Sequence, residues 1–206
     1  MNKRYYFLIR YLPAHTDNEL LAGRCISQMH FFIFDNNQAM NKVGISFPDW
    51  STASVGESIA FIGDEKDLIT GLSFQPYFSL MVKEGIFELS SVLEVPERVT
   101  EARFTRNQNI EKNFLGSKRR RIKRSIARGE LSDITKTLPT SKEERVLEPF
   151  HRVPISSVSS GKEFILFIQK EIADKRYSAN FNTYGLATNQ DRRGTVPDLI
   201  FNPFLK

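Results

Sequence analysis

Few residues of the chain have the types and spacing that catalysis or metal binding requires. There are three histidines, His15, His30 and His151, and one cysteine, Cys25. A single cysteine allows no intrachain disulfide and no cysteine metal cluster, and it favours a reducing compartment. The histidines do not show the H-x-x-x-H or H-E-x-x-H spacing of a metal site. We therefore expect neither a built-in metal nor a cofactor.

His30 falls near the end of a helix predicted over Asn18–Phe32. At about 100° per residue, it points about 180° away from Leu21 in the apolar stripe, so a core histidine is disfavoured. On spacing alone, the default interpretation is an ordinary surface histidine. No residue near it in sequence completes a catalytic triad, and any partner must come from a distant segment.

Other candidate side chains have a structural role as their default. Four serines precede Gly161, and a serine cluster before a glycine is typical of a loop; they are Ser156, Ser157, Ser159 and Ser160. Tyr184 stands in a T-Y-G sequence at the end of a predicted strand, and Phe164 opens a strongly apolar strand. Position alone therefore assigns the serines to a loop and the two aromatic residues to packing.

One short stretch carries the chain's excess of positive charge. The whole chain has 29 Lys+Arg, 24 Asp+Glu and a net charge of +5. Between residues 112 and 128 there are eight basic residues and no acidic one: Lys112, Lys118, Arg119, Arg120, Arg121, Lys123, Arg124 and Arg128. The remainder has 21 basic against 24 acidic residues. A near-neutral body with one concentrated basic element is typical of a nucleic-acid-binding protein.

A helix over this stretch sorts its residues by face. Leu115, Ile122 and Ile126 fall on one side and give the helix an apolar stripe for docking. The opposite side carries Arg120, Arg121, Arg124 and Arg128, with Lys118 and Lys123 on the flanks. A solvated helix face or a localisation signal is the alternative, but the sorting by face favours binding. Arginine suits a duplex groove because guanidinium bridges two acceptors on phosphate or guanine, although charge does not distinguish RNA from DNA.

The first half of the chain alternates between predicted strands and helices. Strands are predicted at Tyr5–Leu12, Val43–Phe47, Ser58–Ile62 and Phe87–Val95, and helices at Asn18–Phe32, capped by Asp17, and at Asp64–Phe74. The order β-α-β-β-α-β is that of a ferredoxin-like fold, which RNA-recognition motifs share with many unrelated proteins. We therefore expect an α+β protein with a ferredoxin-like (RRM-like) domain over residues 1–97.

The second half, residues 98–206, is predicted to be an appended part with the basic helix and a small β unit. Arg98–Asn113 is polar and irregular, which predicts a linker before the helix at about 117–128. Leu131–Phe150 is predicted to be connecting structure. Further strands are predicted at Glu163–Gln169, Asn180–Leu186 and Thr195–Phe201. No stretch approaches the length needed to cross a membrane, so we expect no membrane contact.

Several short motifs, taken in order, resemble one family. They are L-A-G-R-C-I-S-Q-M-H at Leu21–His30, V-G-I-S-F-P-D at Val43–Asp49, F-T-R-N-Q at Phe104–Gln108, the arginine helix, S-V-S-S-G-K-E-F-I-L-F-I at Ser157–Ile168 and F-N-T-Y-G-L at Phe181–Leu186. Their order and spacing over nearly the whole chain resemble the CRISPR-associated endoribonuclease of subtype I-F systems, which processes precursor CRISPR RNA. The polar stretch Ala187–Val196 is a departure with no assigned role.

The resemblance implies a catalytic group of three residues. His30 would be the general base, as an imidazole can be near neutral pH. Ser157 would hold the attacking 2′-OH, and Tyr184 would orient the histidine or the RNA backbone. The implied reaction is a metal-independent transesterification that leaves a 2′,3′-cyclic phosphate and a 5′-OH. Ser157 is chosen over Ser156 and Ser159 only by its distance from Phe164.

The resemblance also implies how RNA is held. The partner is the repeat hairpin of CRISPR RNA, with the arginine helix in the major groove of its stem and Phe164 stacked on the terminal base pair. Arg106 and Gln108 would read base edges near the bottom of the stem. The basic residues of the helix would hold phosphates and bases, with the individual assignments open (Lys118, Arg119, Arg120, Arg121, Lys123, Arg124, Arg128).

The implied enzyme stays on its product as a subunit of a type I-F surveillance complex in the prokaryotic cytoplasm, and it meets target DNA only indirectly. The alternative is a structural subunit that binds the same hairpin without cutting it, and only the enzyme needs His30. A general RRM-like RNA-binding protein is a third hypothesis. The first strands lack the aromatic-rich RNP pattern, which argues against this third hypothesis.

Overall fold

The first sheet forms around β1 (Tyr5–Tyr11), a strand of mostly apolar and aromatic residues that is largely buried. The computed structural model describes residues 3–110, 120, 123–128, 148–156 and 163–199. Within them the strand order of this sheet is β2-β3-β1-β4, and β5 also pairs with β1. The pairs are antiparallel. The remaining bounds are β2 (Gly44–Ser46), β3 (Ser58–Gly63), β4 (Phe87–Leu89) and β5 (Leu93–Glu94).

The helices of the first half are α1 (Asn18–Asp35), a short 3-10 turn (Asn37–Ala39), α2 (Lys66–Ser73) and α3 (Pro76–Lys83). The predicted order β-α-β-β-α-β is confirmed, with α2 in the place of the helix expected at Asp64–Phe74. The additional helix α3 was not predicted. It has Pro76 in its first turn, where the missing N–H of proline removes no helical hydrogen bond. The strand expected at Phe87–Val95 is instead two short strands, β4 and β5.

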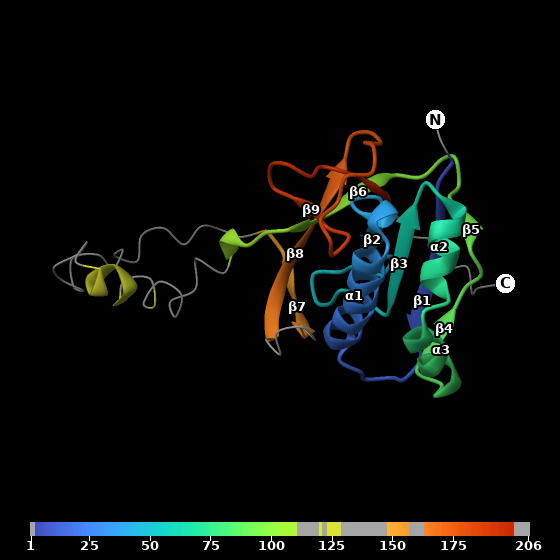
Figure 1. Cartoon of the computed structure of the whole chain (residues 1–206), viewed down its shortest axis with the longest axis horizontal. Helices are drawn as coiled ribbons and strands as arrows, with labels where there is room; N and C mark the ends of the chain where they lie inside the picture. The colour runs from blue at the N-terminus through green and yellow to red at the C-terminus, as the bar shows by residue number, and fades with distance from the viewer. Residues whose placement is uncertain (1–2, 111–119, 121–122, 129–147, 157–162, 200–206) are drawn as a thin grey trace.

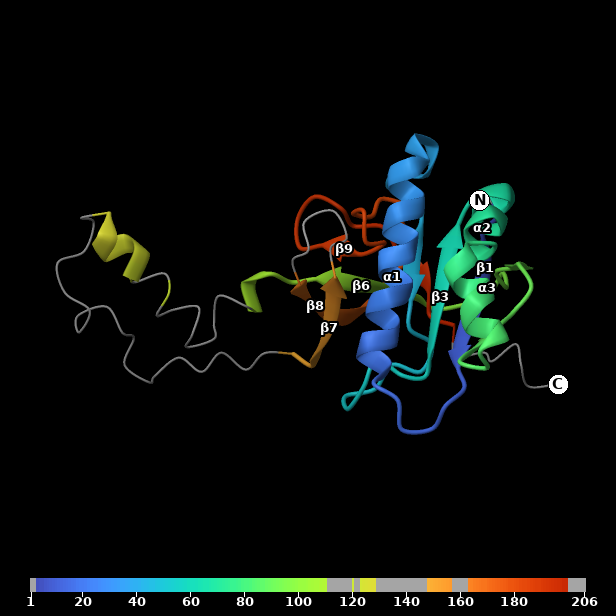
Figure 2. The same ribbon diagram turned by 60° about the horizontal axis from the view of Figure 1, so that its bottom comes forward.

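Helix α1 lies between the two sheets of the protein (Figures 1 and 2). Asp17 caps it as predicted, because its side chain accepts the backbone N–H of Leu20 at 2.8 Å. Ile26 and Met29 are fully buried. Gly23 touches the second sheet so closely that a Cβ there would lie 1.9 Å from the carbonyl oxygen of Pro154. The helix is therefore buried on two sides, unlike an ordinary surface helix with one apolar stripe.

The second sheet is built from the later half of the chain. Its strands stand in the order β10-β6-β8-β7, and β9 pairs in parallel with β6. The bounds are β6 (Glu101–Arg106), β7 (Phe150–Ser156), β8 (Glu163–Ala173), β9 (Ala187–Thr188) and β10 (Val196–Pro197). The described part of the chain is thus an α+β fold with two five-stranded sheets.

Several predictions for this half were wrong. Arg98–Asn113 is not simply a linker, because it contains β6, which is flanked by β10 and β8. Asn180–Leu186 forms a turn instead of a strand. Phe150, expected in connecting structure, begins β7, while residues 129–147 lie outside the described ranges. The strand expected at Glu163–Gln169 is confirmed as the first part of β8, and only Val196–Pro197 of Thr195–Phe201 is a described strand.

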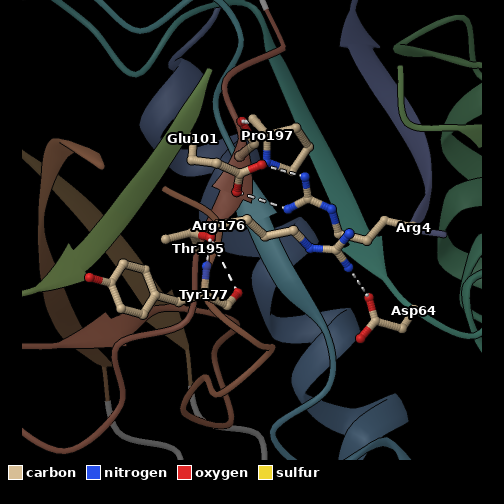
Figure 3. Close-up of polar contacts among 8 residues, drawn as sticks. Arg4, Asp64, Glu101, Arg176, Tyr177, Thr195 and Pro197 are labelled. Carbon is tan, nitrogen blue, oxygen red and sulfur yellow. Dashed lines mark hydrogen bonds and ion pairs between the residues drawn. The ribbon is translucent and has the colours of Figure 1, made fainter. Parts of the chain in front are cut away.

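Paired charges join the two sheets at one end (Figure 3). Arg4, just before β1, donates to the carboxylate of Glu101 at the start of β6, and both side chains are buried. Beside them, Arg176 pairs with Asp64 at 3.1 Å. Apolar residues of both sheets, including Phe7 and Phe104, belong to one continuous core. The two halves of the sequence therefore pack as one body.

The basic stretch is described only in part, and its described residues are drawn in yellow in Figure 1. Residues 123–127 are helical, and the N–H of Arg128 donates to the carbonyl oxygen of Arg124 at 3.2 Å, so the predicted helix is confirmed where it is described. Lys123, Arg124 and Arg128 are exposed, whereas Ile126 is half-buried. This exposure pattern agrees with the predicted faces at these four positions, whereas Leu115 and Ile122 of the predicted apolar stripe lie outside the described residues.

Candidate functional site

His30 is held by a turn that lies far from it in sequence. Its Nδ1 lies 3.0 Å from the carbonyl oxygen of Thr183. A carbonyl oxygen only accepts hydrogen bonds, so Nδ1 carries the proton, and Nε2 of the neutral ring is left as an acceptor. The imidazole also stacks on the ring of Tyr184, with centroids 4.6 Å apart and planes 18° from parallel. The ring is thereby fixed in both tautomer and orientation.

The turn at residues 182–186 owes its shape to an asparagine and a glycine. The Oδ1 of Asn182 accepts the backbone N–H groups of Tyr184 at 2.8 Å and Leu186 at 3.2 Å. Gly185 has φ of +70°, a conformation that favours glycine. A Cβ on Gly185 would lie 2.9 Å from side-chain atoms of Ile45 and Met29. The turn is therefore pressed against α1 next to His30.

Tyr184 is the centre of the site. Its ring contacts that of His30, and it meets Phe164 of β8 edge-on with centroids 5.8 Å apart. The guanidinium carbon of Arg106, at the end of β6, lies 5.3 Å from the centroid of the same ring. Four residues nominated from the sequence are thus brought together from α1, β6, β8 and the turn before β9.

Arg106 is a partly buried cation with unused donor capacity. Burial lowers the pKa of its guanidinium below the ordinary value, and Tyr184 acts in the opposite direction. The Nε of Arg106 is buried without a hydrogen-bond partner among the described residues. Arginine remains charged at neutral pH, and a buried donor without an acceptor is costly. The group is therefore suited to an incoming acceptor such as a base edge or a phosphate.

Gln108 is exposed in the turn that follows β6. The residue before it, Asn107, anchors this turn through a chain of side-chain amides. Asn189 donates to Asn107 at 3.1 Å, and Asn107 donates to Gln169 at 2.7 Å. Asn189 belongs to Ala187–Val196, the stretch without an assigned role. That stretch therefore supports the turn that carries Gln108.

The contacts of the described residues do not test the remaining predicted site residues. Ser157, Lys118, Arg119 and Arg121 lie outside the described residues. Of the basic helix, the described members are Arg120, Lys123, Arg124 and Arg128. The Nε of Arg124 donates to the carbonyl oxygen of Arg120 at 3.4 Å, which is a contact within the helix. The roles assigned to all of these residues stay predictions.

Two contributors to the site were missed in the sequence. Thr183 acts through its backbone carbonyl, which its side-chain type does not reveal. Asn182 acts through a side-chain turn, and the sequence N-T-Y-G contains the signal, because Asn followed closely by Gly is typical of such turns. The expectation of a strand over Asn180–Leu186 hid this signal.

Two features are absent from the described ranges. No three or more His, Cys, Asp or Glu side chains there are grouped closely enough to hold a metal ion. Within the same ranges, no helix is long and apolar enough to cross a membrane.

Comparison with known proteins finds a family model that matches most of the chain. A family model described as "CRISPR-associated protein (Cas_Csy4)" matches residues 6–199. Comparison with curated proteins finds no match. A solved structure titled "Crystal structure of CRISPR RNA processing endoribonuclease Cas6b" is similar at 16% identity, with 85% of this chain and 91% of that chain covered and a TM-score of 0.30. That TM-score is too low to relate the two folds.

The family model includes the positions of His30, Arg106, Phe164 and Tyr184. It therefore covers the whole cluster around the Tyr184 ring as well as the basic helix. The resemblance indicated by the motifs is confirmed: the chain belongs to the Cas_Csy4 family of CRISPR-associated proteins.

Proposed function

We propose that this protein is a sequence- and structure-specific endoribonuclease that binds the stem-loop of the CRISPR repeat and cleaves at the 3′ base of the stem. Family membership supports the RNA substrate. The single observation that carries the catalytic proposal is the fixed imidazole of His30, with Nδ1 donating to Thr183 and the ring stacked on Tyr184. A neutral imidazole with a free Nε2 acceptor is suited to general-base work near pH 7.

The proposed reaction needs no added nucleophile, because RNA carries its own. Nε2 of His30 takes the proton of the 2′-OH upstream of the scissile phosphate, and the 2′-oxygen attacks phosphorus in line. The bond from phosphorus to the 5′-oxygen breaks, and that oxygen takes a proton from water and leaves as a 5′-hydroxyl. The other product ends in a 2′,3′-cyclic phosphate. Ser157 holds the 2′-OH, and much of the rate comes from this positioning.

The RNA is held by the residues around and beyond Tyr184. Phe164 stacks on the terminal base pair of the stem, and Arg106 and Gln108 read base edges near it. The basic helix enters the major groove near the end of the short stem, where the otherwise narrow A-form groove is accessible. Its residues contact phosphates and bases (Lys118, Arg119, Arg120, Arg121, Lys123, Arg124, Arg128).

We further propose that residues 1–97 form a ferredoxin-like unit and that residues 98–206 form the RNA-binding part. The antiparallel order β2-β3-β1-β4 supports the first assignment. The protein stays on the 3′ hairpin of its product as a subunit of a type I-F surveillance complex in the prokaryotic cytoplasm. A subunit that binds the hairpin without cutting it is the alternative outcome of the experiment below.

The experiment compares His30→Ala with wild type on a labelled repeat hairpin. We expect His30→Ala to abolish cleavage and to keep the affinity for the hairpin, because the imidazole acts on the 2′-OH and does not hold the stem. His15→Asn is the matched control, since His15 is an exposed histidine in a different segment, with a positive φ that asparagine tolerates. A large loss of affinity in His30→Ala, or unchanged cleavage, would contradict the assigned role.

A further inference from the structure

The last turn of α1, just beyond His30, exposes an aromatic ring to solvent. Phe34 is 75% exposed. A single exposed apolar residue is ordinary in a folded protein, so exposure alone argues nothing. The position of Phe34 relative to His30 is what makes it informative.

Phe34 shares a helix face with His30. Residues four apart lie on the same side of an α-helix, separated by roughly 6 Å along its axis. Phe31 is three residues before Phe34 and is its neighbour on the helix surface, and the ring centroids of Phe31 and His30 are 6.1 Å apart. The exposed ring therefore lies one helical turn from the imidazole of the proposed catalytic site.

Packing within the fold does not explain why a phenylalanine stands at position 34. Phe32 packs against the core, and its ring lies 3.5 Å from where a Cβ on Gly71 of α2 would be. Ile33 is buried. Phe34 is neither in the core nor among the half-buried residues packed against it. Truncating its side chain should therefore leave no cavity.

We propose that Phe34 stacks on the base of the unpaired nucleotide immediately 3′ of the cleaved bond. This inference rests on the proposed function, in which His30 acts at the scissile phosphate and Phe164 and Arg106 hold the stem. Those stem contacts come from the second sheet, whereas Phe34 comes from α1, one turn beyond His30. The RNA strand that continues past the cut has unpaired bases, and every base offers a face for stacking on an aromatic ring.

The consequence is a contact that exists in the substrate and is absent from the product. The nucleotide 3′ of the cut leaves with the 5′-hydroxyl fragment, while the hairpin stays bound. Phe34 therefore contributes to affinity for the uncut RNA and contributes nothing to affinity for the cleaved hairpin. This difference separates stacking at the cut from a general contact with the stem.

The test measures dissociation constants for two hairpins that cannot be cut, each carrying a 2′-deoxy nucleotide at the cleavage position. One hairpin ends at the cut, and the other continues with one 3′ nucleotide. We expect Phe34→Ala to bind the longer RNA about 5- to 150-fold more weakly than wild type does, and the shorter RNA equally well. Phe34→Tyr keeps the ring and should restore the affinity.

Phe74→Ala is the matched control. Phe74 is also 75% exposed, but it follows α2 and is not on the His30 helix. The Phe74→Ala variant should bind both RNAs as wild type does. Replacing the 3′ base by an abasic site should weaken wild type to the level of Phe34→Ala and should not weaken Phe34→Ala further.

Three results would overturn the inference. The first is equal affinity of wild type and Phe34→Ala for the longer RNA, and the second is an equal loss of affinity for both RNAs. The third is a change in oligomeric state in Phe34→Ala, which would show that Phe34 contacts a second copy of the chain instead of RNA. Cleavage of the all-ribose hairpin by wild type is scored separately. If wild type binds but does not cut, the proposed function fails while the stacking inference is still decided by the affinities.

Discussion

At the level of single residues, one tyrosine ring contacts most of the side chains of the proposed site. The ring of Tyr184 contacts His30, Phe164 and Arg106, which come from three different elements. Stacking fixes the plane of the imidazole without using either ring nitrogen. The Thr183 carbonyl then uses Nδ1 alone, so Nε2 is left as the acceptor for the proposed chemistry.

Arg106→Ala should relax base choice near the cleavage site. The guanidinium is partly buried beside Tyr184, and its buried Nε lacks a partner among the described residues. Arginine contacts to a guanine edge discriminate against the wrong base by about 1–3 kcal/mol. The difference in binding free energy between matched and altered stems should therefore fall by that amount. Arg98→Ala removes an exposed charge in the connection before β6 and is the control. Unchanged discrimination in Arg106→Ala would remove this residue from the readout.

Asn182→Ala should slow cleavage about tenfold or more while sparing affinity for the hairpin, because two hydrogen bonds that shape the turn are lost. Thr183 and Tyr184 would then no longer hold the imidazole. Asn182→Asp keeps an oxygen at the accepting position and should restore most of the rate. Single-turnover kinetics measure both variants, and a wild-type rate in Asn182→Ala would show that the turn does not position His30.

Residue types in the sequence indicated part of this site. Motifs nominated His30, Arg106, Phe164 and Tyr184 from segments far apart in the chain, and the structure brings these four together. The sequence pattern predicts a surface position for His30 because it assumes that the helix has a single buried face, centred on Leu21. In the structure Ala22, Ile26 and Ile33 are also buried, so α1 has two covered sides. A helix wheel alone does not show which distant turn covers a histidine.

At the level of elements, the buried strand β6 is the hardest to predict, because half of its residues are charged. β6 reads E-A-R-F-T-R, which is typical of a polar connection. Its burial is possible because Glu101 pairs with Arg4, Arg103 donates to the carbonyl oxygen of Arg193 at 3.1 Å, and Thr105 donates to Glu171 at 3.2 Å. Buried polar groups are tolerated when they are hydrogen-bonded, but the partners are remote in sequence. Local polarity therefore predicted a linker where there is a buried strand.

Strand β7 was missed for a different reason. It contains Pro154 and reads F-H-R-V-P-I-S, and proline within a strand argues against a central position in a sheet. In the structure β7 is at the edge of the second sheet, where a missing N–H is tolerated. Its alternating burial is the ordinary pattern of a strand with one covered face.

Arg120→Ala combined with Arg124→Ala should weaken RNA binding and flatten its salt dependence. Each lost phosphate contact lowers the slope of log affinity against log salt by about 0.7–0.9, so two lost contacts should lower it by roughly 1.5. Lys66→Ala combined with Lys83→Ala removes the same charge from the exposed surfaces of α2 and α3 and should change the slope little. Equal slopes for wild type and the arginine variant would place the basic helix outside the interface.

At the level of the whole molecule, the two halves of the sequence share one core. Phe7 of the first sheet and Phe104 of the second belong to the same apolar cluster, and α1 packs on strands from both sheets. The proposed site is assembled across this junction, since His30 belongs to the first half and Arg106, Phe164 and Tyr184 to the second. Its geometry therefore depends on how the halves are held together.

Glu101→Ala should destabilise the whole protein by about 3–5 kcal/mol, because it leaves the guanidinium of Arg4 buried without its counter-charge. Both side chains are less than a tenth exposed. Lys42→Ala breaks an exposed pair with Glu65 and should cost about 1 kcal/mol or less. The free energy of unfolding from urea titrations measures both. Equal free energies of unfolding for the two variants would show that the buried pair does not stabilise the packing of the two sheets.

The junction is the part of the fold that the sequence predicts least. Arg4 and Glu101 are 97 residues apart, and the patterns of local periodicity extend over only a few residues on either side of each. The element order of the first half follows from such local patterns and was predicted well. The docking of a second sheet on α1 depends on contacts such as Gly23 against Pro154, which become visible only in three dimensions.

The central claim is that the chain cleaves RNA with its own side chains and the 2′-OH of the substrate. The most direct measurement incubates wild type in EDTA with a labelled repeat hairpin, beside the same hairpin with one 2′-deoxy nucleotide at the cut. We predict a single cut at the 3′ base of the all-ribose stem, a 2′,3′-cyclic phosphate end, and a deoxy hairpin that is bound but intact. Tight binding of the all-ribose hairpin without cleavage, or cleavage of the deoxy hairpin, would contradict the account.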